Sequence, residues 1–209
     1  MRSTLQVLLL SIGALALGGC AMGNRYNYAE VPVTMQGVSS AGAVAIAIAD
    51  ERPYVTSGNK TPQFVGLQRG GFGNPFDVNT ASGRPLAEEM ADALARAMKS
   101  KGADAVAVRV DAKDSEGNAR RKLLESKPRR AVLITLHEWK TDTLMNTDFL
   151  YDVKLVVLDA SGKQLAWHAL KGTDHLGSLG LTPHEGISKA TARKLDKLFD
   201  HDKVIEALK

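Results

Sequence analysis

Glycines at the spacing of a phosphate-binding loop stand in the stretch FVGLQRGGFGNPFDVNTASGRPLAEEM, residues 64–90. Gly66 and Gly71 have the GxxxxG separation, but a nucleotide loop continues with a lysine that neutralises phosphate and a hydroxyl that holds magnesium. Here phenylalanine and glycine follow, and the next predicted helix starts about a dozen residues later, too far to point its N-terminus at a phosphate. The spacing therefore predicts no nucleotide site, and we expect no cofactor.

The same stretch carries charged, aromatic and amide side chains between its glycines, which makes it a candidate contact surface. Aromatic side chains in a polar loop either dock on their own domain or face a partner or a membrane. Two interpretations stay open: a loop folded over the sheet with Phe72 and Phe76 as its plug, or a binding loop. The candidate partner-binding residues are Arg69, Phe72, Asn74, Phe76 and Asp77.

The residue spacing gives little support for a metal site or for the active site of a hydrolase. The chain has five histidines, but no HExxH motif and no pair of metal ligands on a predicted helix. A GxSxG nucleophile motif is absent, and Asp148 and Asp152 cannot be told from a solvated strand face. We predict no catalytic and no metal-ligating residues, and a hydrolase is the weakest alternative.

The first twenty residues predict export and a lipid anchor. Arg2 precedes an uncharged apolar run at 5–17, which is too short to span a bilayer and is typical of a signal peptide. The run ends in LGGC at 17–20, which resembles the lipobox of bacterial lipoproteins. The thiol of Cys20 is the only side chain there that is nucleophilic enough for thioether lipidation. More than one acyl chain on Cys20 would anchor the protein stably in a membrane.

Cys20 also bears on the rest of the chain, since it is the only cysteine. No disulfide is then available, and the exported domain must rely on its core. The next residue is Ala21 rather than an aspartate, which by resemblance to sorted lipoproteins favours the periplasm-facing side of the outer membrane. We predict a signal peptide at 1–19, a lipidated tether at 20–30 and a single domain at 31–209.

A run of positive charge forms a second candidate site. The chain is only mildly basic, with a net charge of +4, and has few aromatic residues, so a nucleic-acid partner is not expected. In an exported protein such a patch points to anionic head groups or an acidic partner, and a solvated surface is the other interpretation. The patch residues are Arg120, Arg121, Lys122, Arg129 and Arg130.

The elements that must position these residues follow from hydrophobic periodicity. Residues 86–98 carry an apolar stripe at helical spacing, with acidic residues before it, basic residues after it and Gly102 as a stop. Residues 43–49 alternate β-branched side chains with alanines, which predicts a strand covered on both faces. Residues 54–83 show no sustained period and indicate a long irregular segment. The other predicted elements are an edge strand at 31–35, a strand at 105–110, a short helix at 119–126, an antiparallel meander at 131–139, 149–158 and 163–171, and a final helix at 184–199.

This order predicts an α+β fold, with a mixed or antiparallel sheet of about five strands and two main helices packed on one face. A doubly wound nucleotide fold would need helices that alternate with strands through the second half, and the pattern lacks them. We therefore expect one α+β domain that follows a lipoprotein signal peptide.

Several segments together resemble a known family. The lipobox, AVAIAIADERP, the glycine-rich segment, PLAEEMADALARAMKSKGADAV and EWKTDTLMNTDFLYDVKLVVLDASGKQLA resemble the YajG-type small bacterial lipoproteins. More distantly, they are similar to auxiliary lipoproteins of ABC-type transport and outer-membrane assembly systems. The resemblance implies an α+β domain that is tethered to a membrane and acts through protein or lipid contacts. Cys20 is the one functional residue that it carries over.

We expect a membrane-anchored envelope lipoprotein that acts as a non-enzymatic interaction or assembly module. Its partners would be the membrane, through acyl chains on Cys20, and an envelope protein or lipid, with no nucleic acid and no nucleotide. The alternative is a binding protein for lipid or a small amphiphile. That alternative predicts an apolar cavity under the helix at 86–98, whereas the interaction module predicts a filled core there.

Overall fold

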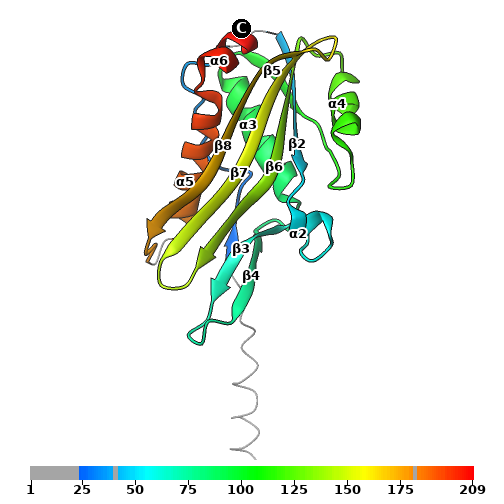
Figure 1. The fold of residues 1–209 in the computed structure, drawn as a ribbon. Coiled ribbons are helices and arrows are strands. Elements are labelled where there is room, and N and C mark those ends of the chain that lie inside the picture. The colour runs from blue at the N-terminus through cyan, green and yellow to red at the C-terminus, as the bar shows by residue number, and fades with distance from the viewer. Residues whose placement is uncertain (1–23, 40–41, 181–182) are drawn as a thin grey trace, which may run out of the picture.

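The computed structural model describes residues 24–39, 42–180 and 183–209. Within these residues the chain forms one mixed sheet of eight strands and five helices (Figure 1). The strands are β1 (Arg25–Tyr26), β2 (Gly42–Asp50), β3 (Phe64–Arg69), β4 (Pro75–Thr80), β5 (Ala103–Ala107), β6 (Arg130–Thr143), β7 (Thr147–Asp159) and β8 (Gln164–Gly177). The helices are α2 (Pro53–Thr56), α3 (Leu86–Ser100), α4 (Glu116–Leu124), α5 (Pro183–Phe199) and α6 (Asp202–Leu208).

Strand β6 organises the sheet, because it pairs with three other strands. On one side it pairs antiparallel with β7 along nearly its whole length, and β7 in turn pairs antiparallel with β8. On the other side, its first half pairs in parallel with β2, and its last residues pair in parallel with β3. The predicted antiparallel meander is confirmed, and it forms the long curled half of the sheet in Figure 1.

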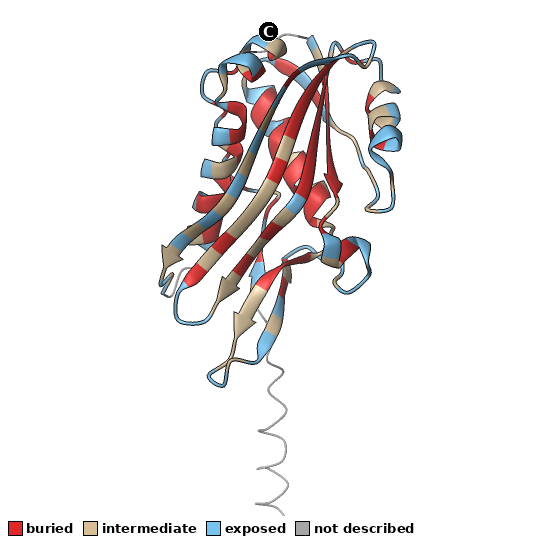
Figure 2. Cartoon of the chain, viewed as in Figure 1, coloured by how far each residue is buried: buried red, intermediate tan, exposed pale blue. Residues whose placement is uncertain are grey.

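The two faces of the sheet are covered unequally. Helices α3, α5 and α6 contribute to a large core on one face, whereas α4 covers a smaller cluster on the other. Figure 2 shows the buried residues concentrated between the sheet and α3 and α5. The prediction of two main helices on one face is confirmed, and α4 is a third helix on the opposite face.

Strand β2 shows why both faces need a cover. Its β-branched side chains Val44, Ile46 and Ile48 lie in the large core, and the intervening alanines Ala45, Ala47 and Ala49 lie in the small cluster beneath α4. Alanine lets the second layer approach closely, and the predicted position inside the sheet is confirmed by the flanking β5 and β6.

Helix α3 matches its predicted stripe. Leu86, Met90, Leu94 and Met98 recur at helical spacing, and all four are fully buried in the large core. After Lys101 the chain turns at Gly102, whose φ of +89° is a left-handed conformation that glycine adopts without strain. The chain then returns directly into β5.

The predicted number of strands was wrong for two reasons, a missed hairpin and a predicted edge strand that does not form. Residues 54–83 are not irregular throughout, because β3 and β4 pair as an antiparallel hairpin whose glycines and prolines hide the period of two. Conversely, residues 31–35 are not an edge strand, although Val31, Val33 and Met35 are buried. Helix α6 was missed because it is short and follows α5 almost directly.

Residues 24–38 form a strap across the helices rather than a free tether. Tyr26 and Tyr28 are buried in the large core. The Glu89 carboxylate of α3 accepts from the backbone N–H groups of Tyr28 (2.8 Å) and Ala29 (3.2 Å). Farther along the strap, Asp196 of α5 accepts from the N–H groups of Thr34 and Met35, each at 2.8 Å. The strap therefore holds Asn24 beside the β3–β4 hairpin, where β1 pairs with β4.

Candidate functional site

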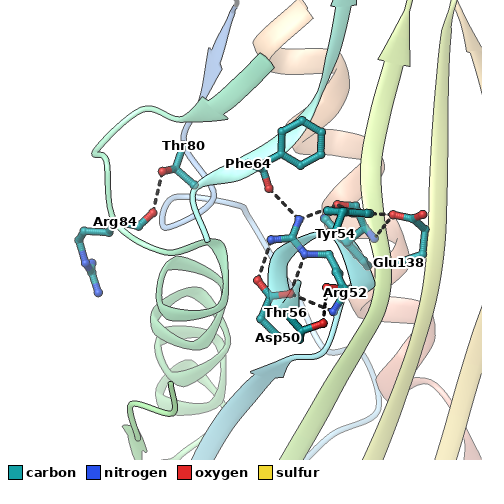
Figure 3. A network of polar contacts seen from close by, with 9 residues as sticks. Asp50, Arg52, Tyr54, Thr56, Phe64, Thr80, Arg84 and Glu138 are labelled. Carbon is teal, nitrogen blue, oxygen red and sulfur yellow. Dashed lines mark hydrogen bonds and ion pairs between the residues drawn. The ribbon is translucent and has the colours of Figure 1, made fainter. Parts of the chain in front are cut away.

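A buried arginine joins the hairpin to the rest of the sheet. Arg52, just before α2, is fully buried and donates to the Asp50 carboxylate through Nε and Nη2, at 2.7 Å each. Its Nη1 donates to the carbonyl oxygens of Phe64 in β3 (2.7 Å) and Trp139 in β6 (3.0 Å) (Figure 3). One guanidinium thus connects the end of β2, the start of β3 and the middle of β6.

The position of Arg52 explains why it is needed. β6 leaves β2 after Leu136, passes an irregularity before Glu138 and pairs with β3 only from Thr141. The carbonyl groups in this gap require other donors, because a buried backbone group without a partner is costly. Burial lowers the pKa of Arg52, but the hydrogen bonds and the charge of Asp50 outweigh it and raise that pKa above the ordinary value. Arg52 is therefore a charged structural joint that positions the hairpin.

Tyr54 extends this joint toward the surface. Its hydroxyl donates to the Glu138 carboxylate at 2.5 Å, and its ring lies 5.5 Å from the Arg52 guanidinium. Burial raises the pKa of the Tyr54 phenol, so the hydroxyl remains a proton donor. The DERP sequence at 50–53 follows the strand predicted at 43–49, and its residue types alone did not indicate the buried ion pair.

The hairpin β3–β4 carries the predicted partner-binding residues, and the structure separates them by role. Arg69 forms a bidentate ion pair with Asp142 of β6, with Nε–Oδ1 at 2.7 Å and Nη2–Oδ2 at 2.6 Å. Asp77 pairs with Lys60 at 2.5 Å. Both pairs hold the hairpin against neighbouring segments, so these two charges are engaged within the domain.

Phe72 lies at the tip of the hairpin and is fully exposed, at 104% of its reference area. Phe76 is half-buried, and the carbonyl of Asn74 accepts from the N–H of Gly70 and closes the turn. The plug interpretation is therefore wrong for Phe72, because the hairpin directs this side chain into solvent. Phe72 is therefore a candidate contact residue, because its exposed side chain does not pack in the core.

Two further exposed apolar side chains lie at the same end of the sheet. Leu144 and Met145 occupy the turn between β6 and β7, next to the place where Gln68 of β3 pairs with Thr143 of β6. A shallow groove of about 380 Å³ runs here, and Asn24, Leu144, Met145 and Leu179 are among its lining residues. We name the turn at 70–74, the turn at 144–146 and this groove the hairpin end; Figure 1 shows both turns at one extremity of the fold.

A second candidate surface is the outer edge of β8, where an exposed tryptophan stands. In the part of the chain that the structure describes, β8 pairs only with β7, so one side of this 14-residue strand has no strand partner. Leu165 and Trp167 are exposed at 42% and 56%. Unpaired backbone groups on an edge strand can pair with another chain, and proteins usually guard such edges with lysine, bulges or kinks.

Charged side chains guard only one half of the β8 edge, although the register with β7 shifts once in each half, between Gln164 and Ala166 and between His175 and Gly177. Residues 171–177 contain Lys171, which pairs with Asp152. Residues 164–170 contain no lysine, aspartate or glutamate. We name residues 164–170 the open edge.

The open edge borders a groove against α6. Leu165 and Lys203 line two adjoining hollows of about 650 and 470 Å³, which also contact Glu206 of α6 and Trp167. His168 extends from the strand to the carbonyl oxygen of Leu198 at 3.0 Å, and its ring lies 4.6 Å from that of His201. The surface thus combines unpaired backbone, an exposed indole and a polar helical wall. We did not predict this site from the sequence; the signal was the uncharged run QLAWHAL.

The predicted anionic-head-group patch is divided between a helix and a strand. On α4, Arg120 pairs with Glu116 at 2.6 Å and Arg121 pairs with Glu125 at 2.8 Å, while Lys122 pairs with Asp114 at 2.5 Å. Arg130 of β6 donates to the carbonyl oxygen of Ala207. Arg129, next to it, is exposed and also has a partner. Acidic neighbours therefore offset the charge of the helical cations.

Two further observations concern the described ranges alone. Their side chains contain no group of three His, Cys, Asp or Glu residues that could hold a metal ion. No helix within the ranges is long and apolar enough to cross a membrane. Cys20, the predicted lipidation site, lies outside them.

Comparison with known proteins gives likeness in fold only. No protein-family model and no curated protein matches the chain. One similar solved structure is a Xanthomonas campestris protein of family model DUF330, at 14% identity, with 90% of each chain covered and a TM-score of 0.43. A PelC dodecamer from Paraburkholderia phytofirmans has 14% identity, covers 78% of this chain and 87% of that one, and has a TM-score of 0.42. The lipoprotein GNA1162 from Neisseria meningitidis has 16% identity, coverage of 75% and 99%, and a TM-score of 0.34. Likeness of this degree carries no functional argument, and the resemblance to YajG-type lipoproteins stays a prediction.

Proposed function

We propose that the protein is a lipid-anchored, non-enzymatic interaction module of the bacterial cell envelope, and that it binds an extended segment of a partner protein along the open edge. The observation that carries the proposal is the half of β8 without lysine, aspartate or glutamate, which offers an edge with no strand partner together with the exposed Leu165 and Trp167. Strand addition uses such a combination, because the backbone supplies affinity and the side-chain pockets supply specificity.

The anchor in this proposal is Cys20, within its lipobox-like LGGC sequence. Acyl chains at this position would hold the domain at a membrane, and the residue after Cys20 favours the periplasm-facing side of the outer membrane. Substitution of Cys20→Ser should abolish incorporation of a labelled fatty acid. Persistence of the label in that variant would refute the anchor.

The filled core beneath α3 supports an interaction module over a carrier of lipid or amphiphile. The four stripe side chains of α3 have no exposed area, and they pack in one continuous cluster with β2, β6 and α5. A carrier would require apolar space at this position, where the described residues leave the helix closely packed.

The test is photo-crosslinking in cells from two positions on the same strand. A photoreactive residue at position 167 should capture a protein, whereas one at position 171 in the guarded half should not. A second variant, Trp167→Lys, adds the kind of charge that guards natural edges and should abolish capture from position 165 without changing the thermal unfolding midpoint. Equal capture from positions 167 and 171, or capture that survives Trp167→Lys, would refute strand addition at the open edge.

A further inference from the structure

We infer that the hairpin end is a second, non-covalent membrane contact, in which Phe72, Leu144 and Met145 enter the interfacial layer of a phospholipid bilayer. The inference rests on the proposed anchor at Cys20. It adds a surface that faces the bilayer, and hence an orientation of the whole domain.

All three side chains are exposed to solvent. Phe72 is fully exposed, Met145 is 81% exposed and Leu144 is 52% exposed, and each lies at the tip of a turn. Turn tips usually carry small or polar residues, and large apolar side chains there contribute little to the core. Exposed apolar groups that gather at one end of a molecule indicate a contact with a partner or a membrane.

The chain at Asn24 runs toward the hairpin tip when it is followed back to the N-terminus. β1 pairs in parallel with β4, with Arg25 opposite Asn79, and β4 runs away from the hairpin tip. Followed toward the N-terminus, the backbone at Asn24 therefore points toward the tip. The strap prevents Asn24 from leaving this position, because Tyr26 and Tyr28 are buried and Glu89 holds the backbone beside them.

The chain between the proposed anchor and the domain is short. Only four residue steps separate Cys20 from Asn24, and they span at most about 14 Å when fully extended. Four residue steps, from Val78 of β4 back to Asn74 in the hairpin turn, cover a similar length. The proposed anchor therefore reaches no farther than the hairpin tip, and Phe72 must lie at or near the membrane surface.

Charge at the hairpin end is compatible with this position. The Asp77 carboxylate pairs with Lys60, and the Asp142 carboxylate pairs with Arg69 in the bidentate arrangement described above. Paired charges are less costly to bring near the head groups than isolated carboxylates, which anionic lipids would repel. Aromatic and long apolar side chains, by contrast, partition favourably into the interfacial layer.

The test uses the full, acylated chain with a fluorescent probe at position 72. In Phe72→Cys the new thiol is the only one available, because Cys20 is the sole native cysteine and its sulfur would carry the acyl group. An environment-sensitive fluorophore on this thiol should shift to the blue when the protein is reconstituted in phosphatidylethanolamine–phosphatidylglycerol vesicles. Lipid-attached spin labels should quench it.

Lys163→Cys provides the matched control. This exposed residue lies in the β7–β8 turn, at the opposite end of the meander from Met145. A probe at position 163 should report water in the same vesicles and should resist quenching. The thermal unfolding midpoint of both variants should equal that of the parent chain, because Phe72 and Lys163 are both exposed.

Each outcome decides the inference. A probe at position 72 that reports water while the protein sediments with the vesicles overturns the membrane contact and leaves the anchor intact. A blue shift that occurs in envelope extracts but not in pure lipid vesicles also overturns it, since the occupant would then be a protein. If the acylated label is missing and the protein does not sediment with membranes, the anchor and the contact fail together.

Discussion

The guanidinium of Arg52 and the carboxylate of Asp50 form a two-bonded ion pair from which solvent is excluded, although only one residue separates them in the chain. The same guanidinium satisfies two carbonyl groups at the place where β6 changes partner from β2 to β3. A local charge pair thus links β2 with β3 and β6, which are distant in the chain.

Substitution of Arg52→Met should lower the free energy of unfolding by about 3–5 kcal/mol, because it leaves a buried carboxylate without its partner. Arg52→Lys should also destabilise strongly, since one ammonium cannot replace a planar group with several fixed donors. Urea denaturation measures both effects. As a control, Arg121→Met breaks an exposed pair with Glu125 and should change stability by no more than about 0.5 kcal/mol.

Gly66 and Gly71, which stand at phosphate-loop spacing in the sequence, should respond in opposite ways to alanine. A Cβ at Gly66 would lie 2.2 Å from Thr141 Oγ1 and 2.6 Å from the Thr141 carbonyl oxygen, so β3 must move away from β6. We expect Gly66→Ala to cost about 1–3 kcal/mol, as overpacking does elsewhere. A Cβ at Gly71 meets nothing within 4 Å, so Gly71→Ala should be nearly neutral in the same denaturation assay.

The β7–β8 turn should make stability depend on pH through Asp159. The hydroxyl of Ser161, followed by the N–H groups of Ser161 and Lys163, lowers the pKa of this carboxylate from 3.8. Because the folded pKa lies below the unfolded value, the carboxylate stabilises the fold above about pH 4, and this contribution is lost as pH falls through the lowered pKa. Asp159→Asn should therefore be less stable than the parent at pH 7, and the difference should shrink on acidification. Ser161→Ala removes the largest cause and should weaken the pH dependence; an unchanged profile would contradict this assignment.

Glu89 should control the strap. Glu89→Leu removes the acceptor for the N–H groups of Tyr28 and Ala29, and the buried N–H of Tyr28 left without a partner should cost about 1–3 kcal/mol. Hydrogen exchange at residues 25–30 should accelerate in this variant, while exchange in the meander stays slow. The neighbouring Glu88→Leu should leave the strap protected, because Glu88 pairs with Arg84 and Arg109 instead.

Much of the fold could be predicted from hydrophobic pattern, because those patterns are local. The stripe of α3 and the alternation of β2 each reflect one element packing on one surface, and both are as expected. The β3–β4 hairpin is different. Gly66 occupies a position where a side chain would show the alternation typical of a strand. Glycine is required there because Thr141 of β6 lies so close. A constraint from a distant segment removes the signal that a local pattern needs.

The candidate sites, too, were predictable from the sequence only where the signal is local. Phe72 was identifiable as an unusual residue in a polar segment, but its direction depends on the hairpin and on the Arg52 joint. Trp167 lies in a predicted strand, and its exposure follows from the position of β8 at the edge of the sheet, which depends on strand order. Strand order comes from pairings between distant segments, and no window of the sequence records it.

The strap has a further consequence for how far the protein can act from its membrane. With the anchor and the hairpin end both at the bilayer, the open edge around Trp167 lies ten residues of β8 beyond Gly177, a rise of up to about 34 Å. A long flexible linker would let this edge lie at many distances from the membrane, whereas a linker of four residues restricts it to one. The height selects partners: a segment that projects well into the periplasm can meet the open edge, and one that lies flat on the lipid cannot.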